Sequence, residues 1–251
     1  MIDSIARFSN RVENYIKYRP GYPSAVIDYL TVAGVLTNDS IVADIGCGTG
    51  ISSRIFLENG NAVIGVEPND SMRTAAIRFL TGFPKFTPID GTSEATTLSD
   101  ASVDMVVAAQ AFHWFDPTNT KKEFQRIVRS GGHIVIIWNE RQLYSTPFLV
   151  DYEAFLLKYA TDYAAVRHDK IDEASVKSFT DTEVDRVTFE NVQELDFDGL
   201  KGRMLSSSYM PSVTDNIYTV MVAELLTLFA KHAENGRIKV FYDTNVFSSR
   251  T

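Results

Sequence analysis

One short segment, residues 42–50, constrains the fold of this chain more than any other. It reads Val-Ala-Asp-Ile-Gly-Cys-Gly-Thr-Gly, and residues 40–45 are mostly apolar, as in a buried parallel strand. From Ile51 the apolar residues fall on one helical stripe that ends near Gly60. A strand, a glycine turn and a helix in this order predict a nucleotide-binding corner. Glycines let a ligand approach the backbone, and the free N–H groups at the helix start favour polar or anionic groups.

The spacing of the glycines narrows the class of ligand. A dinucleotide fingerprint reads G-x-G-x-x-G or A, and Gly46 and Gly48 fit it, but Ile51 stands at its last position. The third glycine, Gly50, comes one residue early, and no lysine follows it as in a phosphate-binding loop. Asp44, two residues before the first glycine, would face a pyrophosphate badly but suits a ligand with an ammonium group. Three glycines alone can also form only a tight turn, so the surrounding sequence must decide.

A second buried strand pattern, residues 62–66, ends at Glu67. An acidic residue at the tip of this strand can accept hydrogen bonds from both hydroxyls of a ribose. The alternative is a solvated strand end. The distance from the glycine turn matches one strand–helix–strand unit, which favours ribose binding.

Several motifs in order resemble those of the class I S-adenosylmethionine-dependent methyltransferases that act on small molecules. The resemblance covers residues 8–140, and the matching segments are 44–50, 66–72, 90–94, 102–107 and 127–136. Residues 18–23 (Tyr-Arg-Pro-Gly-Tyr-Pro) and 110–115 (Gln-Ala-Phe-His-Trp-Phe) further resemble the methyltransferase type 11 subgroup that includes trans-aconitate methyltransferase-like proteins. The substrates of this subgroup are diverse.

The resemblance implies S-adenosylmethionine as the cofactor and S-adenosylhomocysteine as its product. Many relatives carry an aspartate at the adenine-facing turn, where this chain has Thr92, so the adenine contact stays open among Asp90, Thr92 and Ser93. The cofactor-binding residues that it implies are Asp44, Gly46, Cys47, Gly48, Thr49, Gly50, Glu67, Pro68, Met72, Asp90, Gly91, Thr92, Ser93 and Gln110.

Two segments are expected to face the acceptor. The loop after the fourth strand carries His113, a candidate base or orienting donor, and Trp114, because loops beyond the carboxyl ends of parallel strands line the ligand crevice. The alternative for His113 is a hydrogen-bonded structural histidine. The N-terminal segment is expected to fold over the cofactor as a lid, with Tyr18 as a second candidate catalytic residue. The remaining candidates for acceptor binding are Tyr15, Arg19, Tyr22 and Arg141, to which Arg203 can be added.

The lid and the arginines also have plainer interpretations. The N-terminal segment can be a structural turn made rigid by Pro20 and Pro23. Each arginine suits an anionic acceptor by paired hydrogen bonds, but for any one of them an ion pair on the surface or in the lid is the favoured interpretation.

Composition limits the partners. The net charge of −8 argues against a nucleic-acid substrate, and a single cysteine excludes an intramolecular disulfide and suits a reducing compartment. No apolar run reaches membrane-spanning length, and the N-terminus lacks the apolar segment of a signal peptide. We therefore expect a cytoplasmic protein that acts on a small molecule, without metal, nucleic acid or membrane, as a monomer or homodimer.

Strand and helix patterns alternate up to a fifth strand at residues 132–138, which predicts an α/β, Rossmann-like, doubly wound and mostly parallel sheet. The chain then changes to helical patterns at 148–163, 198–207 and 216–232, which predict a helical cap inserted after the fifth strand. By family resemblance, residues 183–195 and 237–247 are expected to form an antiparallel C-terminal edge hairpin. We expect a single methyltransferase domain over 1–251, divided into an N-terminal lid and first helix (1–34), a cofactor-binding core (35–140), a cap with part of the hairpin (141–235) and the last strand (236–251).

Three functions are compatible with these patterns. The first is methyl transfer to a small-molecule acceptor, either a carboxylate, which needs no base, or a hydroxyl, which can need one. The second is an NAD-dependent oxidoreductase on a similar fold, against which the glycine spacing and Asp44 count. The third is a non-catalytic S-adenosylmethionine-binding protein, since this chemistry demands no obligatory catalytic side chain.

Overall fold

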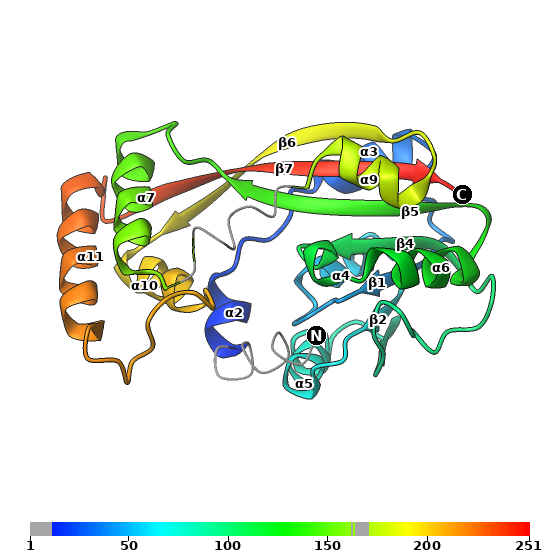
Figure 1. Cartoon of the computed structure of the whole chain (residues 1–251), viewed down its shortest axis with the longest axis horizontal. Coiled ribbons are helices and arrows are strands. Elements are labelled where there is room, and N and C mark those ends of the chain that lie inside the picture. The colour runs from blue at the N-terminus through cyan, green and yellow to red at the C-terminus, as the bar shows by residue number, and fades with distance from the viewer. Residues whose placement is uncertain (1–11, 162, 164–170) are drawn as a thin grey trace.

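A seven-stranded sheet runs through the computed structural model, which describes residues 12–161, 163 and 171–251 (Figure 1). The strand order is β3-β2-β1-β4-β5-β7-β6, and every neighbouring pair is parallel except the two that involve β7. The predicted Rossmann-like sheet with an antiparallel C-terminal pair is therefore confirmed. The strands are β1 (Ile41–Ile45), β2 (Ala62–Val66), β3 (Phe86–Ile89), β4 (Val103–Ala109), β5 (Val128–Arg141), β6 (Asp185–Leu195) and β7 (Ile238–Arg250).

Helices cover both faces of the sheet. Successive side chains of a strand point to opposite faces, so Val42 of β1 belongs to one apolar core and its neighbour Ala43 to the other. Residues of the helices next to β1 and β2 fill the first core, and Phe124 and Phe179 from two later helices fill the second. The helices are α2 (Val12–Tyr18), α3 (Ala25–Val32), α4 (Ile51–Glu58), α5 (Asp70–Phe79), η1 (Phe112–Trp114), α6 (Pro117–Ile127), α7 (Pro147–Tyr159), α9 (Glu173–Thr180), α10 (Phe197–Leu205) and α11 (Tyr218–His232).

The order of the strands reverses between β1 and β4. From β1 the chain continues to β2 and β3 on one side, and then returns to β4 and β5 on the other. At such a switch point the loops beyond the carboxyl ends of the strands diverge and leave a crevice for a ligand. The glycine turn follows β1 directly, so the fold places it in this crevice.

A separate aromatic core lies at the far end of the long strands. Figure 1 shows β5, β6 and β7 extending from the sheet towards α7, α10 and α11. The helix α2 lies between these three helices and the part of the sheet that contains β1, β2 and β4. Phe148, Phe155, Leu200, Leu225 and Tyr242 belong to this third core, which joins α7, α10 and α11 to the start of β7. We call these three helices the cap.

The boundaries of three elements differ from the prediction. β5 is 14 residues long instead of seven. At its carboxyl end the antiparallel partner β7 continues the ladder to Arg141, and at its start Val128 pairs with Val103 of β4. The helix predicted to reach residue 163 ends at Tyr159, where Ala160 turns to an extended backbone. The helix α9 was not predicted, although Asp172 and Ser175 form a capping box at its start. No helix among the described residues combines the length and hydropathy that a bilayer crossing requires.

Candidate functional site

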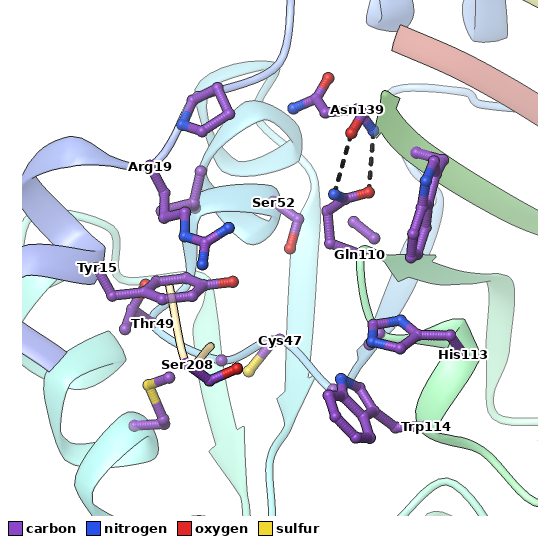
Figure 2. Close-up of a pocket in the computed structure, with 18 of the residues that line it drawn as sticks. Tyr15, Arg19, Cys47, Thr49, Ser52, Gln110, His113, Trp114, Asn139 and Ser208 are labelled. Carbon is purple, nitrogen blue, oxygen red and sulfur yellow. Dashed lines mark hydrogen bonds between the residues drawn. The ribbon is translucent and has the colours of Figure 1, made fainter. Parts of the chain in front are cut away.

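A cavity of about 370 Å³ opens where the crevice of the sheet meets the cap (Figure 2). Its walls come from the turns after β1 and β2, the loop after β4, the end of β5, the N-terminal segment and the cap. It brings together most of the predicted residues. Those that line it are Tyr15, Arg19, Tyr22, Gly46, Cys47, Gly48, Thr49, Glu67, Pro68, Met72, Thr92, Ser93, Gln110, His113, Trp114, Arg141 and Arg203.

Glu67 braces the glycine turn from the neighbouring strand. One carboxylate oxygen accepts a hydrogen bond from the backbone N–H of Gly48 at 2.9 Å, and the other accepts one from the backbone N–H of Asn69 at 2.9 Å. Burial raises the pKa of Glu67 from its ordinary value. Because a carboxylate has about four acceptor positions, Glu67 keeps acceptor capacity towards the cavity.

Asp44 lies completely buried behind the cavity wall. Its Oδ2 accepts hydrogen bonds from the hydroxyls of Ser52 at 2.7 Å and Ser53 at 2.6 Å. Its Oδ1 and the hydroxyl of Thr49 find no hydrogen-bond partner in the described part of the chain. Since buried polar atoms are almost always hydrogen-bonded, these two atoms indicate that a polar ligand group completes the site. An ammonium group supplies donors and charge for Asp44.

The pKa of Asp44 is raised from its ordinary value of 3.8 to about 6, because burial disfavours the charged carboxylate. The hydrogen bonds from the two serine hydroxyls act in the opposite direction but offset the effect of burial only in part. The folded pKa lies above the ordinary value of 3.8, so the ligand-free protein loses stability as the pH rises from about 4 to 6. We expect Asp44→Asn to raise the free energy of unfolding at pH 7.5 and leave it nearly unchanged at pH 3.8. The same variant should bind S-adenosylhomocysteine more weakly at pH 7.5. Urea unfolding and calorimetric titration test both effects, and a variant that is less stable at pH 7.5 would contradict the prediction.

The structure separates the three candidates for the adenine contact. Thr92 and Ser93 line the cavity, whereas Asp90 does not. The Asp90 side chain is 72% exposed and pairs with Arg73 at 3.3 Å. Gly91 also lies outside the lining, packed against the backbone oxygens of Ala95 and Thr96. Of the three candidates, Thr92 and Ser93 are therefore the two that the structure places at the cavity.

Gly50 supports the turn rather than the cavity wall. Its φ of +85° suits glycine, and a Cβ there would lie 2.7 Å from Leu80 Cδ1. The glycine thus lets the start of α4 approach α5, behind the turn.

The N-terminal segment covers the cavity from the side of the cap. The guanidinium of Arg19 lies 4.9 Å from the centre of the Tyr15 ring, and both side chains face the cavity. Tyr18 does not reach it. The Tyr18 ring packs against Gly202 of α10 so closely that a Cβ on Gly202 would lie 2.1 Å from it. Tyr18 therefore lies in the contact between α2 and the cap, outside the cavity lining.

The loop after β4 presents His113 and Trp114 to the cavity (Figure 2). The His113 ring lies 4.5 Å from Trp114 and 5.2 Å from Trp138, centre to centre. Gln110 fixes the start of this loop with φ at +58°. Its amide accepts from the backbone N–H of Asn139 at 2.9 Å and donates to the backbone carbonyl of the same residue at 3.2 Å. The side chain of Gln110 therefore ties the end of β4 to β5 at the wall of the cavity.

Arg141 already has a carboxylate partner. It forms an ion pair with Glu153 of α7, which is buried, and donates a hydrogen bond to the Tyr163 hydroxyl at 2.8 Å. Burial works against this charge, but Tyr163, Tyr152 and Glu153 together leave the pKa of Arg141 above its ordinary value. The structure thus gives Arg141 the ion pair that was the plainer interpretation of each arginine. The sequence does not identify Glu153 as the partner, because Glu153 lies in a helix whose position the sequence does not specify.

Several lining residues were not predicted. Trp138 and Asn139 lie in β5 close to its carboxyl end, at the edge of the sheet that also marked His113, so the sequence contained a signal for them. Tyr163, Ser208, Tyr209 and Tyr242 also line the cavity. Of these, Tyr209 belongs to the stretch 209–211 (Tyr-Met-Pro), which the sequence marks as a candidate to face the pocket through the cap. The sequence gives no clear signal for Tyr163, Ser208 and Tyr242 in that role, because their position depends on how the cap packs.

Comparison with known proteins agrees with this geometry. Residues 43–136 match the family model described as a methyltransferase domain. The chain is 36% identical over 139 residues to an uncharacterized methyltransferase of Mycobacterium tuberculosis, which covers 55% of this chain and 54% of that protein. It is 30% identical over 151 residues to a probable S-adenosylmethionine-dependent methyltransferase of Saccharomyces cerevisiae, covering 58% and 50%. The chain spans about half the length of these curated relatives.

Two solved structures share the fold over nearly the whole chain. A candidate type II methyltransferase from Anaeromyxobacter dehalogenans superimposes with a TM-score of 0.66 at 24% identity, covering 93% of this chain and 98% of that one. A candidate methyltransferase from an antibiotic biosynthesis pathway of Anabaena variabilis gives 0.62 at 22% identity with the same coverage. At this identity the two structures establish the fold only.

Proposed function

We propose that this chain, which has the fold and the domain signature of the class I S-adenosylmethionine-dependent methyltransferases, transfers a methyl group from S-adenosylmethionine to a small molecule. One observation carries the proposal. Beside the glycine turn, a fully buried carboxylate, Asp44, has an oxygen without a hydrogen-bond partner among the described residues. That arrangement suits the amino-acid end of this cofactor and has no use in a pyrophosphate site.

The residues around the turn suit the parts of the cofactor. Two residues suit the amino-acid end of the cofactor: Thr49, which lines the cavity, and Asp44, which lies behind the lining residue Ser52 and accepts its hydrogen bond. Glu67 suits the ribose hydroxyls. Thr92 and Ser93 suit the adenine. When bound, the cofactor supplies a methyl group that is already activated on a sulfonium.

The chain's own contribution is then to bind, orient and exclude water. The aromatic rings of Trp114 and Trp138 flank His113 and form an apolar wall, and aromatic faces attract cations. Aligning the acceptor with the methyl group accounts for most of the rate. We propose a carboxylate or a hydroxyl as the acceptor group, and for a hydroxyl His113 would accept its proton. The net charge of −8 favours a small molecule over a nucleic acid, and we propose a cytoplasmic location.

Replacing His113 should separate chemistry from binding. For a hydroxyl acceptor we expect His113→Ala to lower kcat about 100-fold, because general bases contribute about that factor or more. The Kd for S-adenosylhomocysteine should change by less than about threefold, since the cofactor residues lie on the turns after β1 and β2. His133→Ala is the matched control, because His133 lies in β5 outside the cavity lining. If His113→Ala lowers the unfolding temperature but leaves kcat unchanged, His113 is structural.

A methyl-transfer assay tests the proposed function. The protein is incubated with S-adenosylmethionine carrying a labelled methyl group and with a panel of small carboxylic acids, phenols and alcohols. We expect the label to appear in one chemical class of product. A thermal shift in parallel compares S-adenosylmethionine with NAD. Stabilisation by NAD alone would refute the proposal, and tight cofactor binding with no transfer to any acceptor would favour a non-catalytic binding protein.

A further inference from the structure

Two arginines face the cavity without a carboxylate partner among the residues that the structure describes. Arg19 comes from the N-terminal segment and Arg203 from α10, and both line the cavity. Arg203 is 9% exposed, and the Nε of Arg19 is buried with no hydrogen-bond partner in residues 12–161, 163 and 171–251. Both residues line the same cavity, and burial together with the positive charge of Arg203 lowers the pKa of Arg19.

The groups that hydrogen-bond to Arg19 and Arg203 hold the two side chains in place but do not neutralise their positive charges. Arg19 donates to the backbone carbonyl of Ser206 at 3.1 Å. Arg203 donates through Nε to the Tyr242 hydroxyl at 3.2 Å and through Nη1 to the Ser207 hydroxyl at 3.3 Å. The partners are a carbonyl and hydroxyls, all neutral at pH 7. A guanidinium has five N–H donors, so both side chains keep donors for a ligand.

Arg141 lies in the same cavity but differs from Arg19 and Arg203 in having a carboxylate partner. Its guanidinium is neutralised by Glu153, so it adds no net charge to the wall. Arg19 and Arg203 add two charges in a buried region, which is unfavourable unless a partner arrives. The amino-acid carboxylate of the cofactor can balance one of them. The second guanidinium therefore remains for the acceptor.

We propose that Arg203, with Arg19 beside it, anchors an anionic group of the acceptor, a carboxylate or a phosphate. The inference rests on the proposed methyltransferase function, because it assigns the second anion to the molecule that shares the cavity with the cofactor. Arg203 is the specificity-determining residue, since it comes from the cap and the Tyr242 hydroxyl of β7 orients it. The planar fork of a guanidinium matches the two oxygens of a carboxylate or phosphate.

Binding of small anions to the protein saturated with S-adenosylhomocysteine tests the proposal. The probes are succinate, glutarate and inorganic phosphate, with succinamide and glutaramide as neutral controls, and the readout is the Kd from calorimetric titration. We expect at least one anion to bind about tenfold more tightly than the amides, and Arg203→Gln to abolish that preference. Arg203→Lys should keep part of it, because the charge remains but the fork is lost. Arg237→Gln, at an exposed position, is the matched control.

The outcomes separate the inference from the proposed function. Preference for a dicarboxylate or for phosphate identifies the type of anion, and either supports the inference. Equal binding of anions and amides, no binding of any anion up to about 20 mM, or an unchanged preference in Arg203→Gln would overturn it. The Kd for S-adenosylhomocysteine reports folding of the variant cavity and should stay within about threefold of the wild type. Failure of the wild type to bind S-adenosylhomocysteine would instead refute the proposed function. In that case the same titrations on the ligand-free protein still test the anion site.

Discussion

Glu67→Ala is expected to weaken the binding of S-adenosylhomocysteine about 100-fold or more. The carboxylate is the proposed acceptor for the ribose hydroxyls, and hydrogen bonds to charged groups are each worth about 1.5–3 kcal/mol. The same carboxylate accepts from the backbone N–H groups of Gly48 and Asn69. Its removal therefore also loosens the glycine turn, and both effects act in the same direction.

Glu58→Ala is the control for this experiment. Glu58 lies on α4, about half exposed, and forms an ion pair with Arg54 on the same helix. We expect its effect on the Kd to be within about twofold, because exposed pairs contribute little. Calorimetric titration measures both variants. A Glu67→Ala protein that is folded and binds S-adenosylhomocysteine as the wild type does would show that the ribose site lies elsewhere.

Gly46→Ala is expected to destabilise the protein about 2 kcal/mol more than Gly48→Ala. Both glycines have positive φ, at +69° and +56°, so an alanine at either position is strained by about 1–2 kcal/mol. They differ in the space around them. A Cβ at Gly46 would lie 2.7 Å from the Cβ of Ala111, which cannot move away, whereas Gly48 has nothing within 4 Å. Overpacking of this kind costs about 1–3 kcal/mol.

The contact of Gly46 with Ala111 also joins the glycine turn to the loop that carries His113. A bulkier residue at position 46 is thus expected to displace both the cofactor turn and the wall of the cavity. Urea unfolding measures the loss of unfolding free energy in Gly46→Ala and Gly48→Ala. Calorimetric titration with S-adenosylhomocysteine measures how far the displaced turn weakens cofactor binding. Equal losses of unfolding free energy in the two variants would contradict the close packing at Gly46.

Local patterns predict the cofactor half of this protein well. Val42 and Val63 belong to short apolar runs that end at a glycine turn and at Glu67, and parallel strands bring such ends to one edge of a sheet. The neighbours in the sheet are set by strand–helix–strand units close in sequence. The positions of Glu67 and Thr92 in the cavity follow from this order alone.

The acceptor half depends on contacts between distant parts of the chain. Tyr18 and Arg19 are adjacent in sequence, yet Tyr18 packs on Gly202 while Arg19 lines the cavity. The direction of α2 decides between them, and α10 sets that direction from almost 200 residues away in the sequence. The pairing of Arg141 with Glu153 likewise depends on how α7 lies against the end of β5. Neither periodicity nor motif spacing encodes such packing.

Binding of S-adenosylhomocysteine to the wild-type protein tests the central claim most directly. Calorimetric titration at pH 7.5 should show one molecule bound per chain, with a Kd in the micromolar range, about −8 kcal/mol. NAD at the same concentration should give no heat of binding, because the glycine spacing and the buried Asp44 do not suit a pyrophosphate. Binding of NAD with no binding of S-adenosylhomocysteine would contradict the account of the glycine turn.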